Sequence, residues 1–192
     1  MIDGLSKTES NQRRHWVLLG LESRNRKIIN SQNPMTSQEL KSALTEAEEN
    51  PKKLAAAVSG LLPKVLTYRP APNKWCIHEI VAHLADSEIV FAYRFRQVLA
   101  DTEPTFAPID QDKWAASLGY LDAPIAELLA QYGLERHHNL RLLRRVKPED
   151  LAKSGFHPEQ KKQVTLAEMV GYWSQHGTKH LEQIEERKRA AK

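Results

Sequence analysis

The stretch from 165 to 184 has the apolar pattern of a buried helix face, but two histidines occupy apolar positions in it. The apolar residues recur every three or four positions: Leu166, Met169, Val170, Trp173, Leu181 and Ile184. His176 and His180 lie in the same stripe four residues apart, so their side chains are neighbours on a helix. Burying two imidazoles costs free energy unless their nitrogens find partners. A divalent metal would bind both, and a hydrogen-bonded pair in a polar patch is the alternative.

Three other segments share this helical period, and no segment has a clear strand pattern. We expect long helices over 37–59, 76–100 and 122–147, and a short helix over 112–117. Pro51 is expected to interrupt the first of them. Capping boxes begin the helices at Thr36 and Thr165. Residues 149–164 are expected to form a loop. The pattern predicts an all-α four-helix bundle with a long crossover connection, because several connections exceed the short turns of an up-down bundle.

The first 34 residues are polar and carry two basic clusters, without a sustained amphipathic period. Met35 directly precedes the first strong helix start. We therefore expect a flexible extension over 1–34 and a single bundle domain over 35–192. A basic arm and translated sequence upstream of a start at Met35 both fit this pattern.

The composition excludes several classes of protein. Cys76 is the only cysteine, so an internal disulfide and a cysteine-based zinc site are both excluded. No stretch approaches the roughly 18 apolar residues that span a bilayer, and no secretory signal is evident. The net charge of +4 is spread among mixed acidic and basic residues, without a basic stripe interleaved with aromatics. We expect a cytoplasmic protein that binds neither nucleic acid nor membranes.

His83, in the second expected helix, flanks an apolar stripe and can complete a metal site with His176 and His180. Three neutral imidazoles from two helices can hold a divalent ion and leave positions open for water or substrate, as in catalytic sites. Imidazole suits Zn, Ni, Fe and Co, and the sequence does not select among them. A helical scaffold without a metal would instead keep the three histidines apart. His78 and His83 are five residues apart, which excludes the metalloprotease pattern.

Arg136 interrupts the apolar face of the third long helix. It is either a solvated residue on a rotated helix or a guanidinium that contacts an anionic group of a substrate. Four carboxylates near the histidines in sequence are candidates for orienting the imidazole N–H groups: Glu79, Asp86, Glu88 and Glu182.

Three ordered segments resemble the DinB-like superfamily. They are KWCIHEIVAHLADSE at 74–88, GFHPE at 155–159 followed by Thr165-Leu166, and HGTKHLEQI at 176–184. The resemblance covers about residues 36 to 187. It implies a four-helix bundle whose three-histidine metal site maps onto His83, His176 and His180. Cys76 replaces the usual Ser, and Gly177 replaces the usual Asp, which removes a carboxylate that could orient a ligand.

Relatives with assigned activities are metal-dependent hydrolases or S-transferases that use low-molecular-weight thiols. The resemblance therefore implies an enzyme with a small-molecule substrate and a divalent metal cofactor. In such an enzyme the ion would lower the pKa of a bound water or thiol, which then attacks an electrophile. A non-catalytic metal-binding or stress-response module, with a homodimer as one form, is the alternative.

Overall fold

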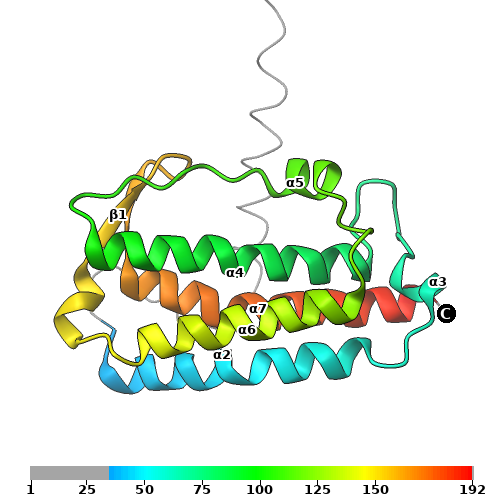
Figure 1. Cartoon of the computed structure of the whole chain (residues 1–192), viewed down its shortest axis with the longest axis horizontal. Helices are drawn as coiled ribbons and strands as arrows, with labels where there is room; N and C mark the ends of the chain where they lie inside the picture. Colours follow the sequence, from blue (N-terminus) through cyan, green and yellow to red (C-terminus); the bar gives the residue numbers. More distant parts are fainter. Residues whose placement is uncertain (1–34, 192) are drawn as a thin grey trace, which may run out of the picture. The chain divides into compact units, whose positions relative to one another are not determined.

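Four long helices pack into a bundle in the computed structural model, which describes residues 35–191 (Figure 1). They are α2 (Ser37–Val58), α4 (Ile77–Ala100), α6 (Ile125–Leu143) and α7 (Leu166–Ala190). Short elements lie between them: α3 (Pro63–Leu66), α5 (Gln111–Ser117), η1 (Pro148–Ala152), β1 (Ser154–His157) and β2 (Lys162–Thr165). The predicted all-α four-helix bundle is confirmed. The extension predicted over residues 1–34 lies outside the described residues.

The order of the helices in the bundle differs from their order in the chain. Helices α4 and α2 lie on opposite sides, and each packs against both α6 and α7 (Figure 1). Helices α4 and α6 are neighbours that run in the same direction (Figure 1). The connection between them, residues 101–124 with α5, must therefore run back along the length of the bundle. This is the crossover connection that the sequence predicted.

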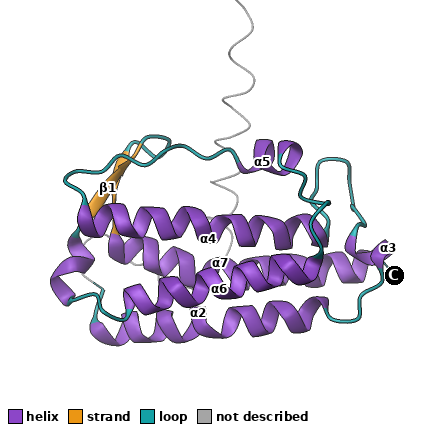
Figure 2. Cartoon of the chain, in the orientation of Figure 1, coloured by secondary structure: helices purple, strands orange, loops and turns teal. Residues whose placement is uncertain are grey.

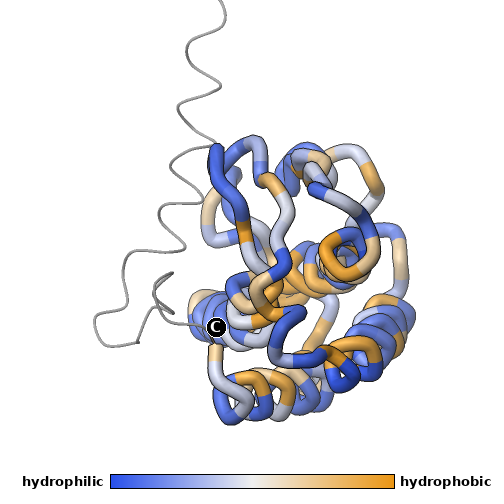
Figure 3. The backbone as a smooth tube through the Cα atoms, turned by 90° about the vertical axis from the view of Figure 1, so that its left-hand side faces the viewer, coloured by the Kyte–Doolittle hydropathy of each residue, from blue (hydrophilic) through white to orange (hydrophobic). Residues whose placement is uncertain are grey.

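The apolar faces of the four helices meet along the bundle axis. A view along the helices shows apolar segments turned inward and hydrophilic segments outward (Figure 3). Fully buried side chains on α4 and α7, among them Ile80, Phe95, Trp173 and Ile184, form much of this core. None of the helices within residues 35–191 is long and apolar enough to cross a membrane.

The predicted capping boxes are present at Thr36 and Thr165. The hydroxyl of Thr165 accepts from the backbone N–H of Glu168 at 3.1 Å, and the Glu168 carboxylate accepts from the Thr165 N–H at 2.8 Å. At the start of α4 the Glu79 carboxylate accepts from the Cys76 N–H at 2.9 Å. These bonds satisfy N–H groups that have no partner inside a helix.

Residues 149–164 are not a plain loop, and this corrects the sequence prediction. After η1 the strands β1 and β2 pair antiparallel, and Phe156 also bridges to Thr105 in the crossover connection (Figure 2). Each strand has only four residues, too few for alternation to be recognised in a sequence. The hairpin leads directly into α7 and so fixes where that helix begins.

Pro51 does not interrupt the first long helix, which is the second correction. Helix α2 continues through Pro51 from Ser37 to Val58. A proline inside a helix removes one hydrogen bond and costs about 3 kcal/mol. Buried residues on both sides of it, Leu44, Ala47, Leu54 and Val58, offset that cost by packing on one continuous face.

Replacing the cap that starts α7 should destabilise the fold. We expect Thr165→Ala to lower the free energy of unfolding by about 1 kcal/mol, because it removes both hydroxyl interactions of the capping box. Urea denaturation measures the change. Thr45→Ala is the matched control, since the Thr45 hydroxyl bonds only the Lys41 carbonyl within an exposed helix face. Equal effects of the two substitutions would contradict a capping role.

Candidate metal centre

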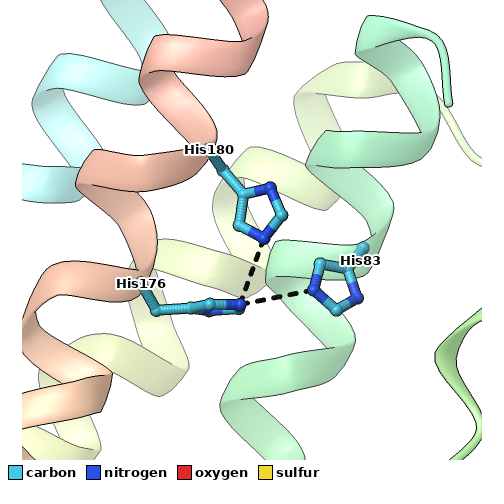
Figure 4. A group of neighbouring side chains, drawn as sticks. All are labelled: His83, His176 and His180. Carbon is cyan, nitrogen blue, oxygen red and sulfur yellow. Dashed lines mark hydrogen bonds between the residues drawn. The ribbon is translucent and has the colours of Figure 1, made fainter. Parts of the chain in front are cut away.

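Three histidines from two helices point toward one another inside the bundle (Figure 4). His83 projects from the first half of α4, and His176 and His180 project from successive turns of α7. All three side chains are buried, with exposures of 5 to 7%. The structure thus brings together the three residues that the sequence singled out. Among residues 35–191 they form the one group of histidine, cysteine or acidic side chains close enough to hold a metal ion.

The Nε2 atom of His176 lies at the centre of the group. It is 3.3 Å from Nε2 of His83 and 3.1 Å from Nε2 of His180. One ligand nitrogen from each residue lies within 4.8 Å of the others. The three Nε2 atoms therefore converge on one point between α4 and α7.

A neighbouring amide fixes how the His180 ring is protonated. Nδ1 of His180 lies 2.9 Å from Oε1 of Gln183, one turn further along α7. An amide oxygen only accepts, so in the tautomer that makes this bond Nδ1 carries the proton and the Nε2 lone pair faces the group. The sequence prediction missed Gln183 because it considered only carboxylates for this role. Gln183 could have been identified from the sequence, because residues three apart on a helix are neighbours.

The surroundings of His176 favour its neutral form. Burial lowers the pKa of His176 well below its ordinary value, and His180 and His83 lower it further. Trp75 packs on His83 with ring centroids 4.8 Å apart, and Tyr172 stacks on His176 at 5.5 Å. Neutral imidazoles with available lone pairs are the form that binds metal ions.

These residues fit a divalent ion. Nitrogens bound to zinc at about 2.0–2.1 Å with tetrahedral angles lie roughly 3.3 Å apart, close to the two separations around His176. Hydrogen bonding among the histidines is the alternative. Nε2 of His176 carries either one proton or one lone pair, so a hydrogen bond would satisfy only one of its two neighbours, whereas a cation would satisfy all three nitrogens. The donor set suits a metal ion but does not identify it.

Gly177 faces away from the three histidines, toward α2 and α6. A Cβ atom added there would lie 2.7 Å from the Tyr132 hydroxyl and 2.9 Å from Nδ2 of Asn50. The Asn50 amide also donates to the carbonyl of Ser174 on α7 at 2.9 Å. Gly177 thus permits a close helix contact, and a carboxylate at this position would meet Tyr132 and Asn50 first.

Arg136 forms a fully buried ion pair with Glu88. Its guanidinium lies 2.7 Å from the Glu88 carboxylate, and neither side chain has any exposed surface. It also donates to the Tyr132 hydroxyl at 2.8 Å and stacks over Trp173, 4.2 Å from the ring centroid. The solvated alternative is therefore wrong. The anion that the guanidinium contacts is Glu88 rather than a substrate, so we do not place Arg136 among substrate contacts.

The carboxylate of Glu88 also accepts hydrogen bonds from two other side chains, one on α7 and one on α6. It accepts from the Trp173 indole N–H at 3.0 Å and from the Asn139 amide at 3.1 Å. Burial raises the pKa of Glu88, and Arg136, Trp173 and Asn139 oppose that rise. Glu88 was expected to orient a histidine, but these contacts show that it joins α4, α6 and α7 instead.

Two of the other three candidate carboxylates, Glu79 and Asp86, also have neighbours away from the histidines. Glu79 caps α4 and pairs with Arg69. Burial raises the pKa of Asp86, and the neighbouring Tyr120 opposes that rise. His78, on the same helix as His83, contacts the Ala123 carbonyl at 2.9 Å and does not join the group.

Comparisons with known proteins found a matching family and similar proteins. The model of the DinB superfamily matches residues 46–184. A Bacillus cereus protein (strain 03BB102), provisionally named a metal-dependent hydrolase, is 30% identical over 153 residues, which cover 79% of this chain and 86% of the relative. A protein of Bacillus thuringiensis subsp. konkukian with the same provisional name matches equally well.

A solved structure has the same architecture. YfiT from Bacillus subtilis, described as a probable metal-dependent hydrolase with an unusual four-helix bundle topology, superposes with a TM-score of 0.78 at 25% sequence identity. The match covers 88% of this chain and 93% of YfiT.

Breaking the buried ion pair should cost much more than breaking an exposed one. We expect Glu88→Gln to lower the free energy of unfolding by about 3–5 kcal/mol, because it leaves the Arg136 charge buried without a countercharge. Glu48→Gln removes the carboxylate of the Arg144–Glu48 pair, which is also 2.7 Å long but about half exposed. That control should cost less than about 1 kcal/mol. Urea denaturation of both variants tests the contrast, and similar losses would contradict it.

Acid should destabilise the protein partly through His157 on β1. Burial, with Arg94 and Lys162 nearby, lowers the pKa of His157 from 6.5 to about 4. The unfolded chain takes up a proton below about pH 6.5 that the folded chain refuses, so stability falls as the pH drops from 6.5 to 4. We expect His157→Gln to remove up to about 3 kcal/mol of this acid-induced loss. Melting curves of both proteins at pH 7 and pH 4.5 measure it, and parallel losses would exclude His157 as a source.

Proposed function

This chain belongs to the DinB superfamily, and from the geometry of its three histidines we propose that it is a metal-dependent enzyme of the hydrolase type. His83, His176 and His180 are the proposed metal ligands. The proposed substrate is a small molecule that reaches the positions left open by the three imidazoles. Transfer of a low-molecular-weight thiol is the second activity that such a site would support.

The observation that carries the proposal is the convergence of three buried Nε2 atoms. Burying three facing Nε2 atoms without a cation between them would cost free energy, because hydrogen bonds among them cannot satisfy all three. The separations of 3.1 and 3.3 Å around His176 match those of nitrogens that share one ion. The provisional names of the Bacillus relatives support the same reading.

A bound divalent ion would supply Lewis acidity and lower the pKa of a water or thiol that it binds. The protein's own residues would orient the histidine ligands and cover the site. Gln183 holds the lone pair of His180 toward the group through the hydrogen bond to Nδ1. The Ser87 hydroxyl lies 3.3 Å from Nε2 of His83, close enough to hydrogen-bond a polar group bound beside that histidine. The rings of Trp75, Phe91 and Tyr172 exclude water from the sides of the site.

A non-catalytic metal-binding module of the stress-response type is the rival proposal. Gly177 was the sequence feature that favoured it, as a lost carboxylate near the ligands. Because Gly177 faces Tyr132 and Asn50 instead, its presence does not argue against activity. A cytoplasmic location, a homodimer and the choice among Zn, Ni, Fe and Co stay predictions.

Metal analysis with matched variants tests the ligand set. We expect the full chain, purified without a histidine tag or added metal, to contain close to one equivalent of a divalent metal. His83→Ala and His176→Ala should each lose most of it, because two imidazoles bind far more weakly than three. His78→Ala, on the same helix but outside the group, is the control and should keep its metal. Full metal retention in both ligand variants would refute the assignment.

Activity assays on the metal-containing protein separate the enzyme from the binding module. Hydrolysis of small esters or amides supports the hydrolase, and consumption of a thiol with an electrophilic partner supports the transferase. Turnover should fall by at least 100-fold in His176→Ala and stay within twofold in His78→Ala. Persistent inactivity toward both substrate classes with metal bound would favour the module.

A further inference from the structure

A second concave site lies far from the histidines, at the C-terminal ends of α4 and α6. It is a cavity of about 310 Å³ whose wall includes Arg96 of α4, Arg141 of α6 and Arg145 just beyond α6. Arg96 lies 13 residues after His83 on the same helix, which corresponds to roughly 20 Å along the axis. The cavity is therefore separate from the candidate metal centre.

The three arginines are not neutralised by the protein. Four other arginines pair with carboxylates, in the pairs Arg69–Glu79, Arg136–Glu88, Arg144–Glu48 and Arg187–Glu186. Among residues 35–191 no carboxylate forms an ion pair with Arg96, Arg141 or Arg145. Arg96 donates to the Ala92 carbonyl of its own helix at 2.7 Å. All three side chains are exposed, and an anion bound in the cavity would meet positive charge from each of them.

Asp150, the one acidic residue that lines the cavity, already has basic and backbone partners of its own. Asp150 pairs with Lys153 at 2.9 Å and accepts from the Lys147 N–H at 3.1 Å. These contacts hold the pKa of Asp150 below its ordinary value. The charge of Asp150 is thus compensated on its own side, and the arginines keep their capacity for a ligand.

The rest of the wall is apolar. Leu99, Leu142 and Val146 line the cavity, and all three are partly exposed there. The volume falls at the lower end of small-molecule sites, which combine an apolar wall with a few polar anchors. Arginine binds phosphate through paired N–H groups, and His138 also lines the cavity.

We propose that this cavity binds a small phosphorylated molecule with a short apolar body, the phosphate contacting Arg96, Arg141 and Arg145 and the apolar part lying against Leu142 and Val146. The site does not depend on the proposed metal chemistry. A nucleic-acid backbone offers the same phosphate group. It would need an extended basic surface rather than a concave one, so we favour the small molecule.

Calorimetric titration with phenyl phosphate and inorganic phosphate tests the proposal on the full chain as purified. We expect saturable binding of phenyl phosphate, tighter than that of inorganic phosphate because of the apolar wall. The double variant Arg141→Gln/Arg145→Gln should weaken it at least tenfold. Arg144→Gln is the matched control, since Arg144 lies between the two in sequence but pairs with Glu48, and it should change binding less than twofold.

Methyl resonances locate the ligand without relying on a variant. Phenyl phosphate should shift the methyl signals of Leu142 and Val146 in the unaltered protein. A short nucleic-acid duplex is titrated in the same way. The proposal is overturned by a lack of saturable binding at millimolar phenyl phosphate, by undiminished binding in the double variant, or by binding of the duplex without binding of phenyl phosphate. Binding of phosphate at the metal centre would be unchanged in the double variant and would not shift the methyl signals of Leu142 and Val146. These two results distinguish it from binding in the proposed cavity.

Discussion

The buried ion pair between Glu88 and Arg136 is the constraint on which the arrangement of the bundle depends. Both charges are removed from water, so each is tolerated only while its partners stay in place. Those partners come from three helices, because Glu88 lies on α4, Arg136 and Asn139 on α6, and Trp173 on α7. An apolar contact would permit sliding by a fraction of a turn. A desolvated charge pair with three further hydrogen bonds does not, since any slip leaves a charge or a polar group unsatisfied.

The same interaction sets the geometry of the three histidines. Glu88 lies five residues after His83 on α4, and Trp173 lies three residues before His176 on α7. The bond between the Trp173 indole and Glu88 therefore fixes the longitudinal register of the two helices within about one turn of the histidines. On the other face of α7, Gly177 lets Tyr132 and Asn50 approach closely. The polar interactions around α7 thus position the three histidines, while the apolar core supplies most of the favourable burial.

The sequence predicted the parts of this structure that depend on local spacing. The pair His176 and His180 follows from four-residue spacing in one apolar stripe, and the capping box at Thr165 follows from its own signature. His83 could be added only by its place beside another apolar face and by resemblance, because spacing does not reveal which helices touch. The partner of Arg136 was missed for the same reason, since Glu88 lies 48 residues away on another helix. The hairpin was missed because strands of four residues are too short to show an alternating pattern. The continuation of α2 through Pro51 was missed because tertiary packing offsets the local cost of the proline.

The long connection between the parallel helices α4 and α6 has a consequence for how the protein is made. His83 and His176 are separated by 93 residues, and the chain between them must cross the bundle before the two rings can meet. Contacts this distant in sequence are slow to form, because the entropy of closing the chain is lost before the contact is gained. A nascent chain that has not yet emerged past α6 presents His83 alone, which is a poor ligand by itself. The proposed metal site would therefore be assembled late in biogenesis, only after the last helix has docked.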